Sequence, residues 1–202
     1  MQITIKNVIV NIKELKDLNE FELRILDFIR ERLACPFLDA LMPVITSLAN
    51  GGIIWILTAA LLLIFKKTRK TGFSVALALL CGFIIGNLLL KNLVGRIRPY
   101  DLNEGVELLI ARLSDYSFPS GHTLASFESA TVLMIRDKRL GIPALILAII
   151  IAFSRLYLYV HYPTDVLAGI ILGIFIGVFA CKAVDFIYKR LKCKRYVKTH
   201  RL

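Results

Sequence analysis

The chain has 202 residues, of which 57% are hydrophobic, and its mean hydropathy is +0.68; soluble domains average roughly 45–50% apolar residues. This composition argues against a water-soluble fold, and the length allows one domain of ordinary size. The net charge is +11, but the basic residues form short blocks between long apolar runs, which is typical of membrane topology and not of nucleic-acid binding.

Residues 19–33 predict an amphipathic helix before the first apolar run. Asn19 and Glu22 have the spacing of a capping box at its start. Four apolar side chains share one helical face: Phe21, Ile25, Phe28 and Ile29. Fifteen mixed residues cannot span a bilayer, so an N-terminal interfacial helix is favoured, with an ordinary helix packed on protein as the alternative.

Five apolar runs follow. Residues 40–65 and 72–90 carry no charged side chain, and each exceeds the roughly 18 apolar residues that identify a membrane span. Runs 123–135, 141–154 and 166–181 are shorter and reach that length only with neighbouring residues. The sequence therefore predicts an all-α, polytopic membrane helix bundle with about five transmembrane helices.

Basic blocks set the expected orientation. Residues 66–70, 136–139 and 189–202 follow the first, third and fifth runs and hold four, three and seven Lys and Arg. The positive-inside tendency makes these sides cytoplasmic. Residues 91–118 and 155–165 are then expected on the opposite, external side, together with the N-terminus.

Glycine spacing predicts close helix packing. Gly82 and Gly86 are four residues apart, as are Gly169, Gly173 and Gly177. Within an apolar helix, such spacing lets a neighbouring helix approach closely.

Ionisable side chains at the external edges of the runs need an explanation, because charged groups near lipid are costly. They are Lys91, Arg96, Arg98, His122, Arg155, His161 and Asp165. Several cations, two histidines and a carboxylate suit phosphate-ester chemistry, in which donors surround the anionic transition state, one group attacks and another protonates the leaving oxygen. Snorkelling of basic side chains to lipid headgroups is the alternative.

The spacing of these residues supports the phosphate interpretation. Ser120 can cap a helix that begins at Gly121, where free backbone N–H groups point toward an anion. His161 and Asp165 are four residues apart, so the carboxylate can hold one imidazole nitrogen and leave the other free to attack.

Together these residues resemble the three-part signature of the type 2 phosphatidic acid phosphatase superfamily, and the resemblance covers residues 41–185. The parts are Lys91-x6-Arg98-Pro99, Pro119-Ser120-Gly121-His122 and Ser154-Arg155-x5-His161-x3-Asp165. The resemblance implies a metal-independent phosphatase of lipid phosphates without a cofactor.

The resemblance also implies a role for each matching residue. His161 would be the nucleophile that forms a phosphohistidine, Asp165 would orient it, and His122 would protonate the leaving oxygen and then activate water. The phosphoryl oxygens would be held by Lys91, Arg98, Ser120, Gly121 and Arg155. Arg96 occupies no defined position of the signature and is not assigned to the site.

The expected function is hydrolysis of a membrane lipid phosphate or diphosphate on the external face, with undecaprenyl diphosphate, phosphatidylglycerophosphate and phosphatidic acid as candidate substrates. Two alternatives stay open: a phosphotransferase that uses an alcohol acceptor, and a non-catalytic anion-binding membrane protein. The expected division is a polar segment with the interfacial helix (1–39), a transmembrane catalytic domain (40–186) and a basic cytoplasmic tail (187–202).

Two further features are acidic. Glu128 follows His122 by six residues and is expected to point away from the site, with a buried hydrogen bond to Asn87 or a pair with a cation as its preferred role. The loop 100–118 is the expected selector of substrate, and its four acids form no evident second phosphate site: Asp101, Glu104, Glu107 and Asp115.

Overall fold

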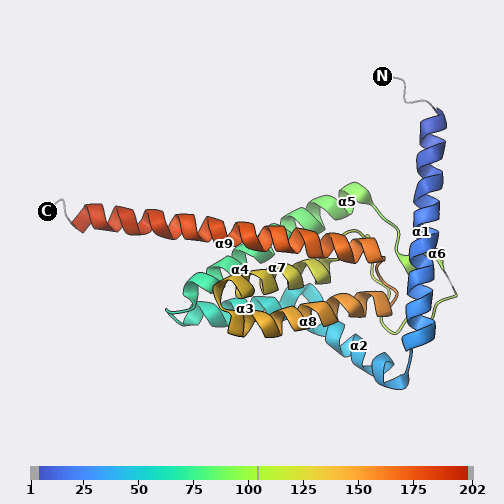
Figure 1. Ribbon diagram of the computed structural model, residues 1–202, viewed down its shortest axis with the longest axis horizontal. Helices are drawn as coiled ribbons and strands as arrows, with labels where there is room; N and C mark the ends of the chain where they lie inside the picture. Colours follow the sequence, from blue (N-terminus) through green and yellow to red (C-terminus); the bar gives the residue numbers. More distant parts are fainter. Residues whose placement is uncertain (1–4, 104, 200–202) are drawn as a thin grey trace.

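The computed structural model describes residues 5–103 and 105–199, with side chains for residues 18–103 and 105–191. All regular elements in these residues are helical, which confirms the predicted class. In chain order they are α1 (Ile5–Leu33), α2 (Pro36–Leu48), η1 (Asn50–Gly52), α3 (Ile53–Ile64), α4 (Arg69–Gly82), η2 (Phe83–Leu90), α5 (Lys91–Val94), α6 (Pro99–Leu102), α7 (Gly121–Arg136), α8 (Lys138–Tyr157) and α9 (Pro163–Thr199) (Figure 1).

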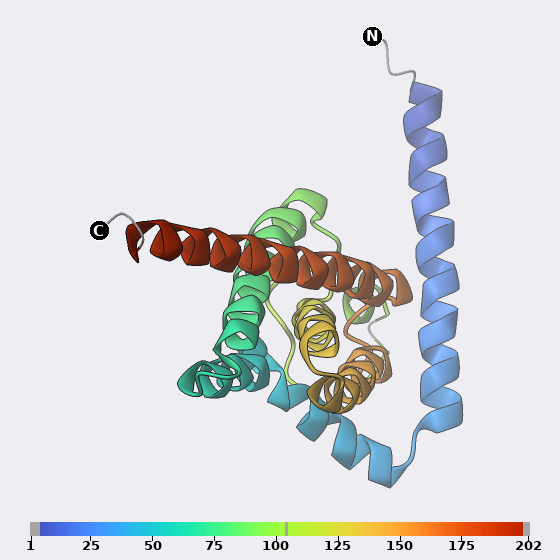
Figure 2. The same ribbon diagram turned by 60° about the vertical axis from the view of Figure 1, so that its left-hand side comes forward.

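Helix α7 lies at the centre of the bundle. It packs along α9, α8 and α4, and Figure 2 looks nearly along its axis (yellow), with α9 (red) on one side and α8 (orange) on another. Leu124, Ala130 and Leu133 of α7 are almost fully buried in the main apolar core. The helix that carries Ser120 and His122 at its start is therefore enclosed by the rest of the bundle.

The glycine stripe of α9 packs against α7, as the spacing predicted. A Cβ at Gly173 would lie 2.9 Å from the backbone nitrogen of Glu128, and one at Gly177 would lie 2.7 Å from its carbonyl oxygen. Since no side chain fits at these distances, the two backbones approach as closely as glycine allows.

Four of the five predicted spans correspond to helices of spanning length. Residues 69–102, 138–157 and 163–191 pass the test of length and hydropathy singly, and α2 with α3 passes as a bent pair. Helix α7 has only 16 residues and is about 24 Å long, which is shorter than the roughly 30 Å hydrocarbon core. By this test the described residues hold three candidate spans, or four with the bent pair, and α7 falls short of it by its length.

The first predicted span is broken in the middle. Helices α2 and α3 meet at 42°, and the two glycines between them, Gly51 and Gly52, have φ values of 58° and 72°. This left-handed backbone region favours glycine and ends the helix. The break leaves Asn50 on a short connecting turn, where it contacts the site described below.

Apolar side chains also cover the outside of the bundle. Leu57, Ile146 and Phe175 are between 54% and 69% exposed. Contiguous apolar surface of this kind suits contact with lipid chains and not with water. It agrees with a membrane location for the long helices.

Helix α1 crosses one end of the bundle nearly at right angles to the other helices (Figure 1). It begins at Ile5, so the capping-box prediction at Asn19 and Glu22 was wrong; both residues lie inside the helix and bind another side chain. Phe21 and Phe28 point outward, more than half exposed. One face of α1 therefore packs on protein and includes Ile29 of the predicted apolar face, whereas Phe21 and Phe28 of that face are free to meet a membrane surface.

Candidate active site

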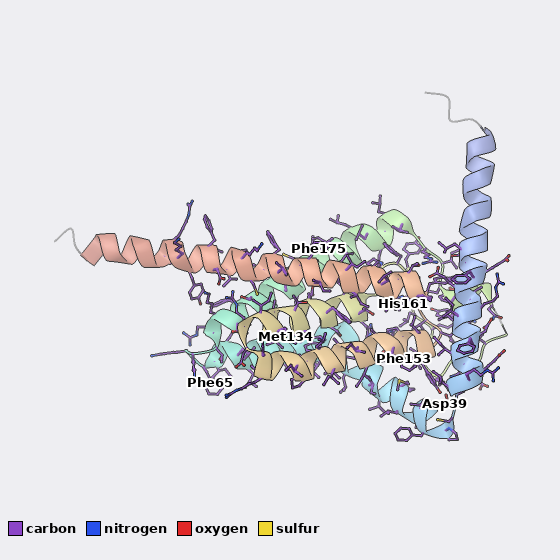
Figure 3. The ribbon with its side chains drawn as sticks, viewed as in Figure 1. Asp39, Phe65, Met134, Phe153, His161 and Phe175 are labelled. Carbon is purple, nitrogen blue, oxygen red and sulfur yellow. The ribbon has the colours of Figure 1, made fainter. Side chains whose placement is uncertain are left out.

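The three motifs meet at the end of the bundle that α1 crosses. Figure 3 shows His161 beside the start of α9 and next to α1, while Phe65 and Met134 mark the opposite end. Lys91 begins α5, Arg98 precedes α6 and Arg155 lies in the last turn of α8. The fold thus brings together residues that are up to 74 positions apart in the sequence.

Each guanidinium nitrogen of Arg98 donates a hydrogen bond to another group of the protein. Its Nη1 donates to the Val160 carbonyl oxygen at 2.7 Å and lies 3.4 Å from His161 Nε2. Its Nε and Nη2 donate to the backbone oxygen and a side-chain oxygen of Asp115, at 2.8 Å and 2.6 Å. With only 2% of Arg98 exposed, its positive charge is fixed directly beside the His161 ring.

His161 and Asp165 lie close together, as their spacing predicted. Nδ1 of His161 is 3.5 Å from Asp165 Oδ2, and that oxygen also accepts from the Ser117 hydroxyl and from the Tyr162 backbone N–H. Nε2 faces the N–H groups of Arg98 and Nδ1 faces the Asp165 carboxylate, so both neighbours together place the proton of the neutral ring on Nδ1. Nε2 then carries the free electron pair that a nucleophile needs.

The surroundings keep His161 neutral. Burial, together with the nearby Arg98 and Arg155 charges, lowers the pKa of His161 to about 3, although Asp165 opposes this shift. An unprotonated imidazole is the form that can attack phosphorus.

Within the part of the chain that the structure describes, the His122 side chain makes no hydrogen bond to another predicted site residue. Its Nε2 lies 2.9 Å from Asn50 Oδ1 in the break between α2 and α3. The break in the first span therefore places the Asn50 amide within hydrogen-bond distance of the second histidine. Sequence reasoning did not identify Asn50.

Arg155 has unmatched hydrogen-bond donors. It is 1% exposed, and its Nη1 donates to the Thr46 hydroxyl. Its Nε and Nη2 are buried without a partner among the described residues. Buried unpaired donors on a cation are costly, so this position is suited to an anion that would satisfy them.

Ser120 and Gly121 form the start of α7. The Ser120 hydroxyl accepts from the Thr123 backbone N–H at 3.5 Å, and the Ser120 N–H donates to the Asp165 carbonyl oxygen at 3.1 Å. This second bond ties the start of α7 to the start of α9. A Cβ at Gly121 would lie 2.9 Å from Asn87 Oδ1, so a larger residue there would require the Asn87 side chain to shift.

The Asp115 carboxylate forms ion pairs with two of the cations that were predicted to bind phosphate. Its carboxylate contacts Lys91 Nζ and lies 2.6 Å from Arg98 Nη2. Burial alone would raise the pKa of Asp115, but the Lys91 and Arg98 charges lower it to about 2. Sequence reasoning found no role for this acid; its position five residues before Ser120, inside the loop that joins two motifs, was the available signal.

A cavity of about 580 Å³ adjoins this cluster. Lys91, Asp115 and His122 line its polar end, and the remaining lining is largely apolar. His161, Arg98 and Arg155 do not line it; they are buried beside it.

Glu128 lies on the same cavity as His122, contrary to the expectation that it points away. The first half of α7, from Gly121 to Glu128, lines the cavity, so residues six apart both reach it. Glu128 Oε2 is buried without a hydrogen-bond partner among the described residues and presses against Gly82. The predicted bond to Asn87 or to a cation is therefore wrong.

Arg96, which the sequence did not assign, contacts the site directly. Its Nη1 lies 2.6 Å from Asp165 Oδ1. Its membership of the first motif segment, between Lys91 and Arg98, was the signal that could have indicated it.

Comparisons with known proteins agree on one family. The model of the PAP2 superfamily matches residues 69–189. An undecaprenyl-diphosphatase of Sulfolobus acidocaldarius is 38% identical over 125 residues, 61% of this chain and 60% of that protein. The undecaprenyl-diphosphatase BcrC of Bacillus subtilis is 31% identical over 140 residues, 69% of this chain and 72% of BcrC.

The crystal structure of Aquifex aeolicus LpxE is similar with a TM-score of 0.70 and 31% identity, covering 79% of this chain and 94% of that chain. The match to the Sulfolobus protein thus spans less than two thirds of that relative.

Proposed function

The chain belongs to the PAP2 superfamily, and we propose that it is an integral membrane phosphatase that hydrolyses a lipid phosphate or diphosphate through a phosphohistidine. Substrates of the relatives, among them undecaprenyl diphosphate, are the first candidates. Phosphatidylglycerophosphate and phosphatidic acid carry a terminal phosphate monoester in place of a diphosphate and complete the candidate class.

One observation supports this proposal above the others: a cluster of buried cations and histidines adjoins an apolar cavity. Lys91 and His122 line the polar end of the cavity, and Arg98 and Arg155 are buried next to it. Cationic donors suit a phosphate, and apolar walls suit a hydrocarbon chain. A lipid phosphate carries both groups in one molecule.

The geometry supports a two-step reaction. Nε2 of His161 attacks phosphorus, a P–N bond forms, and the bond to the leaving oxygen breaks as His122 gives that oxygen a proton. Water then attacks the phosphohistidine and gives a proton to His122, and the P–N bond breaks to release phosphate. Arg155, with two unmatched donors, is placed to stabilise the charge that develops on the phosphoryl oxygens.

Positive charge for this reaction comes from the chain itself. Lys91, Arg98 and Arg155 meet at the site, and such clamps can stabilise a transferring phosphoryl group as a metal ion would. We therefore propose that turnover requires no metal.

We also propose that the site faces the outside of the cell and that the tail is cytoplasmic. The basic blocks after α3 and α7 lie at the bundle end opposite His161, near Phe65 and Met134 (Figure 3). The positive-inside tendency places that end in the cytoplasm. Labelling of Asp101→Cys by an impermeant thiol reagent added to intact cells tests this orientation, and labelling only after permeabilisation would reverse it.

The function is tested by phosphate release from purified protein in detergent. The panel contains undecaprenyl diphosphate, phosphatidylglycerophosphate and phosphatidic acid, each with and without EDTA. We expect release from at least one lipid, unchanged by EDTA. Loss of activity in EDTA that magnesium restores would contradict metal independence, and transfer of labelled phosphate to an added lipid alcohol in place of release would identify a phosphotransferase.

Asp115→Asn should lower KM. Substrate phosphate must displace the Asp115 carboxylate from Lys91 and Arg98, and the neutral amide competes less. We expect a decrease of about fivefold, equivalent to the roughly 1 kcal/mol of a strong solvent-exposed ion pair, because about half of the Asp115 side chain is exposed. Asp101→Asn, which loses only an exposed pair with Arg112, is the matched control; a higher KM in Asp115→Asn alone would show that this acid assists binding.

A further inference from the structure

A buried ionic network joins α1 to the carboxylate beside His161. At its centre is Arg96, whose Nη1 lies 2.6 Å from Asp165 Oδ1 and whose Nη2 donates to Glu22 of α1. Glu22 is 2% exposed and Asp165 is fully buried. Two carboxylates from the two ends of the sequence thus share one guanidinium.

Both terminal nitrogens of the Arg96 guanidinium have further hydrogen-bond partners. Nη2 also donates to Asn19 Oδ1 at 2.8 Å, and Nη1 to Thr164 Oγ1 at 2.7 Å. The guanidinium lies 3.8 Å from the centre of the Tyr162 ring, a distance at which the ring face attracts a cation. Such a planar group with fixed partners has little freedom to turn.

Glu22 is fixed by a second set of contacts. Its Oε1 accepts from the backbone N–H and from the hydroxyl of Thr164, both at 2.7 Å. Because Thr164 lies in the first turn of α9, Glu22 satisfies a free N–H at the start of the helix that carries Asp165. Helix α1 is therefore docked on the same turn that presents the orienting carboxylate.

The two carboxylate oxygens of Asp165 contact different partners. Oδ2 faces His161 and accepts from Ser117 and Tyr162, whereas the described contacts of Oδ1 are with Arg96. A carboxylate held at Oδ2 alone could still rotate about its side-chain bond, and contact at Oδ1 restricts that rotation. The angle at which Oδ2 meets the imidazole thus depends on Arg96.

We propose that Arg96 and Glu22 are a positioning pair for the nucleophile: Arg96 holds Asp165 so that His161 keeps its proton on Nδ1, and Glu22 holds Arg96. The inference rests on the proposed function in taking His161 as the nucleophile. It makes the docking of α1 a condition for an oriented site.

The test uses full-length protein in detergent with ¹⁵N-labelled histidine. The chain has three histidines, so loss of a signal in His161→Ala identifies its ring nitrogens, whose shifts report which one carries the proton. We expect protonated Nδ1 in the wild type and a mixture of the two neutral tautomers in Arg96→Met. For turnover of a lipid phosphate we expect a kcat lower by about 10²-fold, the scale of a small misplacement of a reacting group, with little change in KM.

Several variants separate positioning from mere attachment of α1. Arg96→Lys keeps the charge but loses the fork that reaches both carboxylates, so its tautomer mixture and kcat should be intermediate. Arg112→Met removes an exposed arginine of the neighbouring loop and should change neither quantity. If Arg96→Met does not fold, Arg96→Met combined with Glu22→Gln removes the unpaired buried charge of α1 and gives the same readout.

An Arg96 variant that loses thermal stability but keeps the proton on Nδ1 would overturn the proposal, because the pair would then only attach α1. The tautomer measurement does not require activity. If the wild type releases phosphate from no lipid on the panel, the proposed function fails while the positioning pair is still decided by the ring nitrogens.

Discussion

His161→Ala should reduce phosphate release to background. The substitution removes Nε2, the atom that we propose forms the P–N bond, and no other described imidazole adjoins both Arg98 and Asp165. Loss of a nucleophile costs a hydrolase on the order of 10⁶-fold in kcat. The measurement is steady-state phosphate release together with rapid-quench trapping of acid-labile phosphohistidine, which should be absent from the variant.

Asp165→Asn should reduce turnover to an intermediate level and complements the His161→Ala experiment. The amide keeps the shape of the side chain but supports an imidazolium less well, so turnover should fall between wild type and His161→Ala. Phosphohistidine that still accumulates in His161→Ala, and is absent in His122→Ala, would show that the two histidines have the opposite roles.

The motif residues could be predicted from the sequence because their chemistry restricts them. Two histidines, a carboxylate and several cations at the ends of apolar runs have few other uses, and spacing alone placed His161 beside Asp165. The glycine stripe of α9 was predictable for a similar reason, since close contact between helices depends on a local pattern.

The supporting residues could not be predicted, because their roles depend on contacts that are distant in sequence. Glu22 and Thr164 are separated by 142 positions, and Asn50 and His122 by 72. The spacing of Asn19 and Glu22 fits a capping box equally well, and only the docking of α1 shows that they bind Arg96 instead. Asp115 was equally ambiguous, since an acid in a loop has no partner until the loop is placed.

The break in the first predicted span shows the same limit. A glycine pair within an apolar run predicts a weak point in a helix, but not the direction of the 42° bend. The bend brings Asn50 to His122, a contact that the sequence does not indicate.

His122→Ala should affect substrates according to their leaving group. The imidazole is assigned to protonate the departing oxygen, and loss of a general acid costs about 10²–10⁴-fold. A lipid alkoxide needs that proton and should show the full loss in kcat. A nitrophenyl phosphate, whose leaving group is stable as an anion, should be partly spared in the bond-breaking step, and its phosphohistidine should accumulate because His122 no longer activates water.

Asn50→Ala provides the matched control for this prediction. It keeps the imidazole of His122 but removes the amide that lies 2.9 Å from its Nε2, so the proton donor is present but less well oriented. We expect the same dependence on leaving group with a smaller loss, measured as the ratio of the single-turnover rates of leaving-group release from a lipid phosphate and from nitrophenyl phosphate. If His122→Ala slows this leaving-group release equally for both substrates, His122 is not the acid that protonates the leaving oxygen.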